Sequence, residues 1–385
     1  MESYDVLVLG GGISGVAAAL AATAAGARTA LVRRGPGATA LAAGGWQGTP
    51  PAALRAALAA AGLELVSCAQ PLPHPDGALR RCDCAPPAHA RAAIGAAAER
   101  TIVCGIAGLP GFHATALAAL WADAAGLPPH EFEGVEIVLP DTPPAGWAPL
   151  AVAALIERSP RSLARPLADR ARERGAARVI LPAVIGVLDH DRTREAVQSE
   201  TGLIVAEALA AAPSLPGWRL DHALMRALHA AGVAVVAGSV HERAGHGRSL
   251  QRVVVAGEHG ALPLAARAFV LATGKFIGGG IAGEHSFEEV ALDCDVALER
   301  FGRTFDDPGA ALVLTDAVRT ETQPVLALGV VIDEHARPLR PDGTVCYDNV
   351  VAAGGVLAGA GTDSGLGTAA ASGWNAGEFA AGLAR

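Results

Sequence analysis

Six residues near the start of the chain, Gly10-Gly11-Gly12-Ile13-Ser14-Gly15, have the spacing of a phosphate-binding glycine turn. The apolar run over residues 4–9 predicts a strand before the turn, and the alanine-rich run over residues 16–25 predicts a helix after it. In such a unit Gly10 permits the tight turn, Gly12 lets a pyrophosphate reach the backbone, and Gly15 lets the helix pack on the strand. The unpaired N–H groups of the helix N-terminus favour phosphate oxygens. The chain is therefore predicted to bind a nucleotide.

The second predicted strand, over residues 28–32, ends at Arg33 and Arg34. In the usual dinucleotide fingerprint a carboxylate stands at this strand end and binds a ribose hydroxyl. No carboxylate is available here, so the adenosine ribose of NAD or FAD lacks its usual ligand. Two interpretations stay open: the arginines face a phosphate, as in NADP or mononucleotide binding, or they form a solvated basic strand end.

Other small-residue segments could bring backbone close to a flat ligand. They are the loop over residues 39–46, a β-hairpin that closes on residues 272–274, and a last strand that ends in glycines and leads into a terminal helix over residues 369–383. We predict that these segments and the first glycine turn hold one cofactor. The predicted contacts are Gly10, Gly11, Gly12, Ile13, Ser14, Gly15, Arg33, Arg34, Gly44, Gly45, Trp46, Val240, Ala272, Thr273, Gly274, Gly354, Gly355, Gly365 and Thr368.

Composition excludes several classes of protein. The formal net charge of −8 argues against a nucleic-acid-binding protein, which needs a basic face. No uninterrupted apolar run reaches the roughly 18 residues of a membrane-spanning helix. The N-terminus begins directly with a strand and shows no signal-peptide pattern, so we expect a cytoplasmic protein.

We predict no metal site. The six cysteines are scattered, and only Cys82 and Cys84 form a close pair, without the spacing of a zinc or iron–sulfur site. His190 lies between two aspartates, but no further ligand stands at a recognisable distance along the chain.

The strand-and-helix pattern restarts at Thr101, which predicts an α/β segment inserted into a nucleotide-binding domain. A helix predicted from His222 to residue 231 follows the break at residues 215–218. The expected division is 1–100 for the N-terminal part of the nucleotide-binding domain, 101–218 for the insertion, 219–275 for the middle part with the hairpin, 276–324 for a small cap segment, and 325–385 for the C-terminal part.

The sequence resembles a flavoprotein family in the order of four elements. They are the first glycine turn, Gly44-Gly45, the hairpin that closes on Ala272-Thr273-Gly274, and the last strand, which ends in glycines. Four stretches narrow the resemblance to anaerobic glycerol-3-phosphate dehydrogenase, and within that complex to the subunit designated B. They are VCGIAGLPGFH at residues 103–113, ILPA at 180–183, LPGWRL at 215–220 and ATGKFIGGGI at 272–281.

The resemblance implies an α/β fold: a Rossmann-like flavin-binding domain, built from a parallel sheet plus a β-hairpin, with inserted α/β and cap segments. It implies FMN or FAD as the cofactor; the glycine turn favours FAD, whereas the missing acid after the second strand fits FMN. The family's complex oxidises sn-glycerol 3-phosphate to dihydroxyacetone phosphate and passes electrons to quinone. The implied partners are a larger flavin subunit and an iron–sulfur subunit, which could attach the complex to the inner face of the membrane.

Two other functions stay open. The chain could be a flavin-bearing assembly or electron-transfer subunit without substrate chemistry, or a stand-alone flavin dehydrogenase for another small substrate. Oxidation of an alcohol by a flavin needs a base for the hydroxyl proton, and a phosphorylated substrate needs a cation or a helix N-terminus. The candidate catalytic residues are Lys275, His285 and Arg319.

Overall fold

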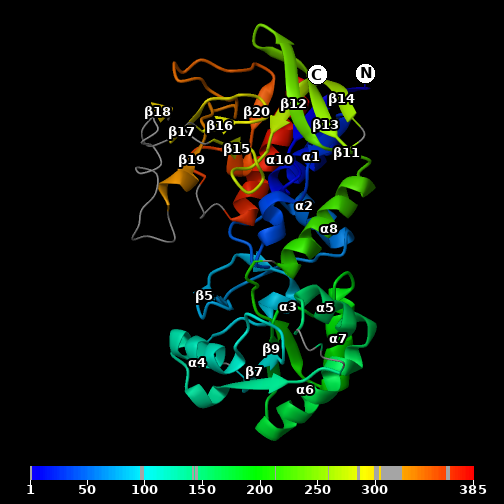
Figure 1. Cartoon of the computed structure of the whole chain (residues 1–385), viewed down its shortest axis with the longest axis vertical. Coiled ribbons are helices and arrows are strands. Elements are labelled where there is room, and N and C mark those ends of the chain that lie inside the picture. The colour runs from blue at the N-terminus through cyan, green and yellow to red at the C-terminus, as the bar shows by residue number, and fades with distance from the viewer. Residues whose placement is uncertain are drawn as a thin grey trace. The chain divides into compact units, whose positions relative to one another are not determined.

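The structure is a computed structural model that describes residues 2–385 except 96–98, 141, 142, 144, 145, 213, 259, 284–286, 299–302, 305–322 and 361–364. The chain forms two compact units (Figure 1). Unit 1 comprises Met1–Thr39, Gly48–Ala61 and Asp221–Arg385, and unit 2 comprises Ala40–Gln47 and Gly62–Leu220. Unit 1 is therefore assembled from both ends of the chain.

The sheet of unit 1 has a parallel part and an antiparallel part. Its parallel strands lie in the order β11-β2-β1-β14-β20. Strands β12 and β13 continue from β14 as an antiparallel meander. The bounds are β1 (Glu2–Leu9), β2 (Thr29–Arg33), β11 (Ala234–Ala237), β12 (Ser239–His246), β13 (Ser249–Gly257), β14 (Gly260–Leu271) and β20 (Val350–Ala352).

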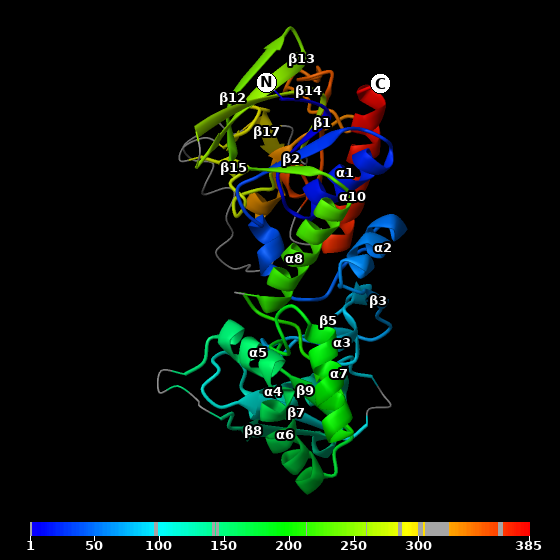
Figure 2. The same cartoon turned by 90° about the vertical axis from the view of Figure 1, so that its right-hand side faces the viewer.

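Both faces of the central strand β1 are covered, as parallel sheets require. Val6 and Val8 point to one face and Leu7 and Leu9 to the other, and all four are at most 1% exposed. On one face lie α1 (Ile13–Ala24) and α10 (Leu366–Leu383), which are side by side in both views (Figures 1 and 2).

Glycines let these two helices touch backbone to backbone. A Cβ atom on Gly373 would lie 2.0 Å from the carbonyl oxygen of Ser14, and one on Gly377 would lie 2.2 Å from that of Ala18. No larger residue fits at either position unless the helices move apart. The last helix of the chain is thereby held against the first.

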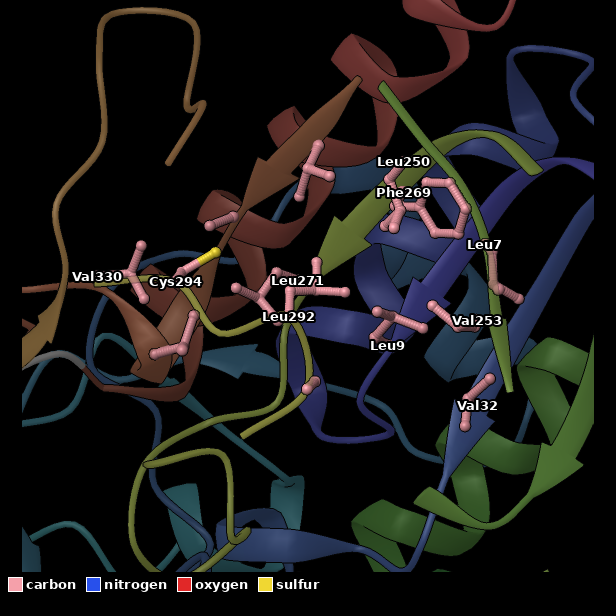
Figure 3. Close-up of a cluster of buried hydrophobic side chains, with 14 of the residues drawn as sticks. Leu7, Leu9, Val32, Leu250, Val253, Phe269, Leu271, Leu292, Cys294 and Val330 are labelled. Carbon is pink, nitrogen blue, oxygen red and sulfur yellow. The ribbon is translucent and has the colours of Figure 1, made fainter. Parts of the chain in front are cut away.

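The opposite face of the sheet packs on a hydrophobic cluster (Figure 3). Leu7 and Leu9 of β1 and Phe269 and Leu271 of β14 meet Leu292, Cys294 and Val330 there. The covering segments contain β15 (Ile281–Ala282), β16 (Glu288–Glu289), β17 (Val296–Leu298), β18 (Arg303–Thr304), η3 (Pro324–Ala327) and β19 (Leu328–Val330). Residues of the predicted cap segment thus contribute to the core of unit 1.

Unit 2 is a smaller α/β unit whose parallel strands lie in the order β10-β9-β7-β8. Ile102 and Cys104 of β7 face a cluster with α5, α6 and α7, whereas Val103 faces α4. The bounds are β7 (Thr101–Ile106), α4 (Ala114–Ala125), β8 (Phe132–Ile137), α5 (Pro149–Arg158), α6 (Pro160–Arg174), β9 (Arg178–Leu181), α7 (His190–Thr201) and β10 (Ile204–Glu207).

The remaining elements are short or connecting. They are η1 (Gly37–Leu41), α2 (Ala52–Ala60), β3 (Val66–Ser67), β4 (Leu72–Pro73), β5 (Leu79–Arg80), β6 (Cys84–Ala85), α3 (Pro87–Ala90), η2 (Pro129–Glu131), α8 (Leu215–Ala230) and η4 (Gly354–Val356).

The predicted α/β class, with a parallel sheet and a β-hairpin, is confirmed, and the hairpin gains β12 as a third strand. The prediction that a helix begins at His222 is wrong, because residues 215–218 form the first turn of α8. Pro216 suits a first helical turn, where its missing N–H group has no partner to lose. The Ser214 hydroxyl accepts a hydrogen bond of 3.0 Å from the Gly217 N–H group at this helix start.

The close contact between α1 and α10 predicts that alanine substitution has different effects on stability at two glycines of α10. Gly373→Ala should lower the free energy of unfolding by about 1–3 kcal/mol, because the added methyl group meets backbone that cannot rotate away. Gly382→Ala is the control: a Cβ there has nothing within 4 Å, so this change should be neutral or raise stability by up to about 1 kcal/mol. Urea unfolding measures both, and equal effects would contradict the tight helix contact.

Candidate functional site

The first glycine turn is pressed against the segment that follows β14. Gly10 has a positive φ of 119°, and a Cβ on it would lie 2.2 Å from the carbonyl oxygen of Ala272. A Cβ on Gly15 would lie 1.9 Å from the carbonyl oxygen of Gly10. The parallel pairing of β1 with β14 causes this contact, because both strands end at the same edge of the sheet. Two predicted cofactor-binding turns therefore adjoin.

The N-terminus of α1 carries polar groups that suit an anion. Its N-cap is Gly12, which supplies no side-chain cap, and the Ile13 N–H group donates to the buried Thr39 hydroxyl at 3.0 Å. The Ser14 hydroxyl is also buried, and it has no hydrogen-bond partner among the described residues. A buried polar group without a partner is costly and rare. Ser14 can therefore supply a hydrogen bond to a ligand at this helix end.

The C-terminal part of the chain reaches the same serine. Gly354 has a φ of 74°, and a Cβ on it would lie 2.5 Å from the Ser14 hydroxyl oxygen. The Gly354 N–H group donates to the Ser372 hydroxyl of α10 at 3.1 Å. A Cβ on Gly355 would lie 3.8 Å from the Cα of Gly274. The structure thus brings three predicted segments together around the start of α1.

The start of α10 lies beside a further glycine. A Cβ on Gly48 would lie 2.6 Å from the Thr368 hydroxyl oxygen. Gly365, the N-cap of α10, has no side chain to cap the helix, whose N-terminus carries a partial positive charge.

Arg33, at the end of β2, is paired rather than solvated. Its side chain is 12% exposed and donates to both carboxylate oxygens of Asp221 in α8, at 3.0 and 3.2 Å. Arg34, by contrast, is exposed. The Gly238 N–H group donates to the Arg33 carbonyl at 2.9 Å, which brings the start of β12, with the half-buried Val240, to this strand end.

Gly44, Gly45 and Trp46 belong to unit 2. A Cβ on Gly44 would lie 2.4 Å from Nε2 of His89, and one on Gly45 would lie 2.3 Å from the sulfur of Cys82. Trp46 is 1% exposed. The small residues are thus needed for packing inside unit 2, and cofactor contact by these three residues stays a prediction.

Lys275 follows the turn at residues 272–274, but its amine is engaged. Nζ donates to the carbonyl of Ala360 at 2.5 Å and to that of Leu326. Burial lowers the pKa of this lysine to about 8. Its ammonium group therefore ties together the segments before β19 and before α10. The other two candidates, His285 and Arg319, lie outside the described residues.

Two carboxylates beside the site, Asp221 and Glu289, were not predicted from the sequence. Asp221 has no motif around it, and only its pairing in space with Arg33 reveals it. Glu289, 1% exposed, accepts hydrogen bonds from the N–H groups of Ala291 (2.9 Å) and Leu292 (2.8 Å) and from the Thr273 hydroxyl (3.4 Å). Burial raises the pKa of Glu289. No sequence pattern identifies a carboxylate that accepts hydrogen bonds from the backbone and side chains of a turn in this way.

His190 does not form part of a metal cluster within the part of the chain that the structure describes. Burial lowers its pKa to about 4, so the imidazole is neutral at pH 7. Unit 2 also contains a buried ion pair, in which Arg219 donates to Glu207 at 2.7 Å and to the carbonyls of Ile185 and Gly186. This pair holds the loop after β9 to the end of β10.

A parallel sheet with a glycine turn, a meander and a returning C-terminal helix defines a dinucleotide-type flavin fold. Residues 5–216, more than half of the chain, match the sequence model of a family described as FAD dependent oxidoreductase, and residues 153–369 match one described as FAD binding domain. The chain therefore belongs to the FAD-dependent oxidoreductase family.

Relatives confirm the resemblance predicted from the motifs. A Halobacterium salinarum protein, named as the probable subunit designated B of anaerobic glycerol-3-phosphate dehydrogenase, is 32% identical over 70% of this chain and 63% of its own length. The subunit of the same designation from Yersinia enterocolitica is 33% identical over 49% of this chain and 43% of its own. The chain thus spans less than two thirds of the length of these relatives.

A solved flavocytochrome c3 fumarate reductase in its open conformation matches 100% of this chain and 79% of its own, with 14% identity and a TM-score of 0.41. No helix in the described residues has the length and apolar character needed to span a bilayer.

The residues at the site fit a flavin nucleotide. The Ser14 hydroxyl, without a partner among the described residues, and the start of α1, where the N-cap Gly12 has no side chain, suit its phosphates. Gly354 and Gly355 leave backbone without side chains beside them. The cofactor of the matched families is FAD, and this chain is a flavoprotein.

Ser14→Ala tests the orphaned hydroxyl. The cofactor-free variant should be at least as stable as the parent protein, because it loses a polar group that has no partner. Its affinity for FAD should fall by about tenfold, the effect of one lost hydrogen bond to a charged oxygen. Thr23→Ala, on the same helix and also without a hydroxyl partner among the described residues, should leave affinity unchanged. Quenching of flavin fluorescence measures both, and equal affinities in the two variants would contradict the assignment.

Lys275 is the chain's one lysine, so its amine can be titrated alone by NMR on protein labelled with ¹⁵N-lysine. We expect a pKa of about 8 in the folded protein, against an ordinary value of 10.5. Between those values the unfolded chain binds more protons, so this group should make the free energy of unfolding rise with pH. Titration at 10.5 would show that the amine is solvated and not held on the two carbonyls.

Proposed function

We propose that this chain is a flavin-dependent dehydrogenase subunit that oxidises sn-glycerol 3-phosphate to dihydroxyacetone phosphate. The supporting observation is the site at Ser14, where both ends of the chain meet around the N-terminus of α1. The chain is also related, over 70% of its length, to a protein named as a subunit of that dehydrogenase. The name of this relative supports glycerol 3-phosphate as the substrate, and the contacts around Ser14 support this helix end as the flavin-binding site.

The proposed reaction is a two-electron oxidation. When bound, the flavin accepts the hydride from the carbon that carries the hydroxyl group. The hydroxyl proton passes to a base, and the substrate phosphate requires a cation or a helix N-terminus. His285 and Arg319 stay candidates for these two tasks. Lys275 has a positioning role in this proposal, because its ammonium group fixes the backbone before α10.

The cofactor-binding residues of the proposal are those predicted from the sequence. Gly10, Gly11, Gly12, Ile13, Ser14 and Gly15 bind the phosphates, and Ala272, Thr273, Gly274, Gly354 and Gly355 border the flavin. Gly365 and Thr368 direct the positive end of α10 toward it, which favours the reduced anionic form. Arg33, Arg34 and Val240 are assigned to the nucleotide end of the cofactor. Gly44, Gly45 and Trp46, which pack inside unit 2, stay predictions from the sequence alone.

We propose that the chain works in a complex, since its relatives are named as subunits. The partners would be a larger flavin subunit and an iron–sulfur subunit that carries electrons to quinone. The complex would be cytoplasmic, attached to the inner face of the membrane through those partners.

A second candidate function is electron transfer without substrate chemistry. It is favoured by Lys275, a candidate base whose amine is already bonded to two carbonyls. Oxidation of another small substrate by a stand-alone enzyme is the third candidate.

The experiment is anaerobic reduction of the bound flavin. The purified chain, fully loaded with flavin, is mixed with sn-glycerol 3-phosphate, and the visible flavin absorbance should bleach; glycerol and glycerol 1-phosphate are the controls. Bleaching only after a larger flavin subunit is added supports the electron-transfer function instead. No bleaching with or without that partner rejects glycerol 3-phosphate as the substrate.

A further inference from the structure

We infer that Asp221 binds the adenosine ribose of FAD and so supplies, from helix α8, the carboxylate that strand β2 lacks. The inference concerns which flavin the site selects, and it rests on the flavoprotein assignment rather than on the substrate.

Arg33 occupies the position where the dinucleotide fingerprint has its acid. A Cβ on Gly11 would lie 2.4 Å from the Cβ of Arg33 and 3.1 Å from its Nε, so the arginine side chain runs directly beside the glycine turn. The guanidinium group donates to both oxygens of Asp221, at 3.0 and 3.2 Å. The carboxylate is therefore held at the nucleotide end of the turn by the residue that replaced the usual acid.

The Asp221 carboxylate can accept further hydrogen bonds from a ligand. A carboxylate offers about four acceptor positions on its two oxygens. The bonds from Arg33 use one position on each oxygen, and both come from a single nitrogen of the guanidinium group. The Asp221 side chain is 19% exposed, which leaves the remaining positions within reach of two neighbouring hydroxyl groups. Vicinal ribose hydroxyls are the matching donors.

The surroundings of the pair also suit an adenosine. Met225, one helical turn beyond Asp221, contacts Arg33 through its sulfur and is half-buried. The start of β12 adjoins the same strand end through the bond from Gly238 to the Arg33 carbonyl. A thioether and a strand edge are an apolar, polarizable border for a purine ring.

The pairing fits neither of the two interpretations of Arg33, because its guanidinium group faces a carboxylate and is neither solvated nor free for a phosphate. An arginine bonded to a carboxylate is neutralised as a pair and has less attraction for a further phosphate. The site should therefore prefer FAD to NADP. It should also prefer FAD to FMN, because FMN has no adenosine ribose and gains nothing from Asp221.

The test compares FAD and FMN affinity of the cofactor-free full chain by fluorescence quenching. Asp221→Ala should weaken FAD binding by about tenfold or more, the effect of losing hydrogen bonds to a charged acceptor, and should leave FMN affinity unchanged. The double variant Arg33→Glu/Asp221→Ala returns a carboxylate to the end of β2, so FAD affinity should recover. Asp348→Asn, which breaks the exposed pair with Arg248 at 3.2 Å, is the control and should change neither affinity.

The possible results distinguish failure of the ribose assignment to Asp221 from failure of the flavoprotein assignment. Equal losses of FAD and FMN affinity in Asp221→Ala would assign the residue a structural role only and overturn the inference. A double variant that binds FAD no better than Asp221→Ala would overturn it as well. A parent chain that binds neither flavin would reject the flavoprotein assignment itself, and the substrate proposal is tested separately by flavin reduction.

Discussion

The contact between the first and last helices is the constraint on which the site depends. Gly373 and Gly377 let the backbone of α10 rest on the carbonyl groups of Ser14 and Ala18. That approach brings Gly354, bonded to Ser372 of α10, onto the Ser14 hydroxyl. A bulkier residue at any of these glycines would separate the two chain ends where they meet, and the segment at Gly354 would move away from the glycine turn at residues 10–15.

Two charged side chains of unit 1 bind to groups from segments that are distant in the sequence. Arg33 of β2 pairs with Asp221 of α8, and Lys275 holds carbonyls that precede β19 and α10. Each charged group is partly buried, so each needs a partner to offset the loss of water. The pairing with Arg33 also holds a carboxylate at the end of β2, where the strand itself has none.

Much of this could be predicted from local patterns. The apolar run before Gly10, the alanine-rich helix after it, the hairpin and the final strand are all recognisable, since each follows from residue periodicity and turn chemistry. What periodicity cannot show is which distant side chains meet. The pairing of Asp221 with Arg33, the carbonyl ligands of Lys275 and the turn brace at Glu289 arise only when the sheet order is set. Residues 215–218 resemble a break because proline and glycine stand there, yet both are accommodated in the first turn of a helix.

The central claim is that opposite ends of the chain hold one flavin at the start of α1. Hydrogen–deuterium exchange of the cofactor-free chain, with and without added FAD, tests it most directly. FAD should slow exchange both in the peptide that contains residues 10–15 and in the peptide that contains residues 353–357. Slower exchange at only one of these segments, or at neither, with FAD bound, would contradict the account.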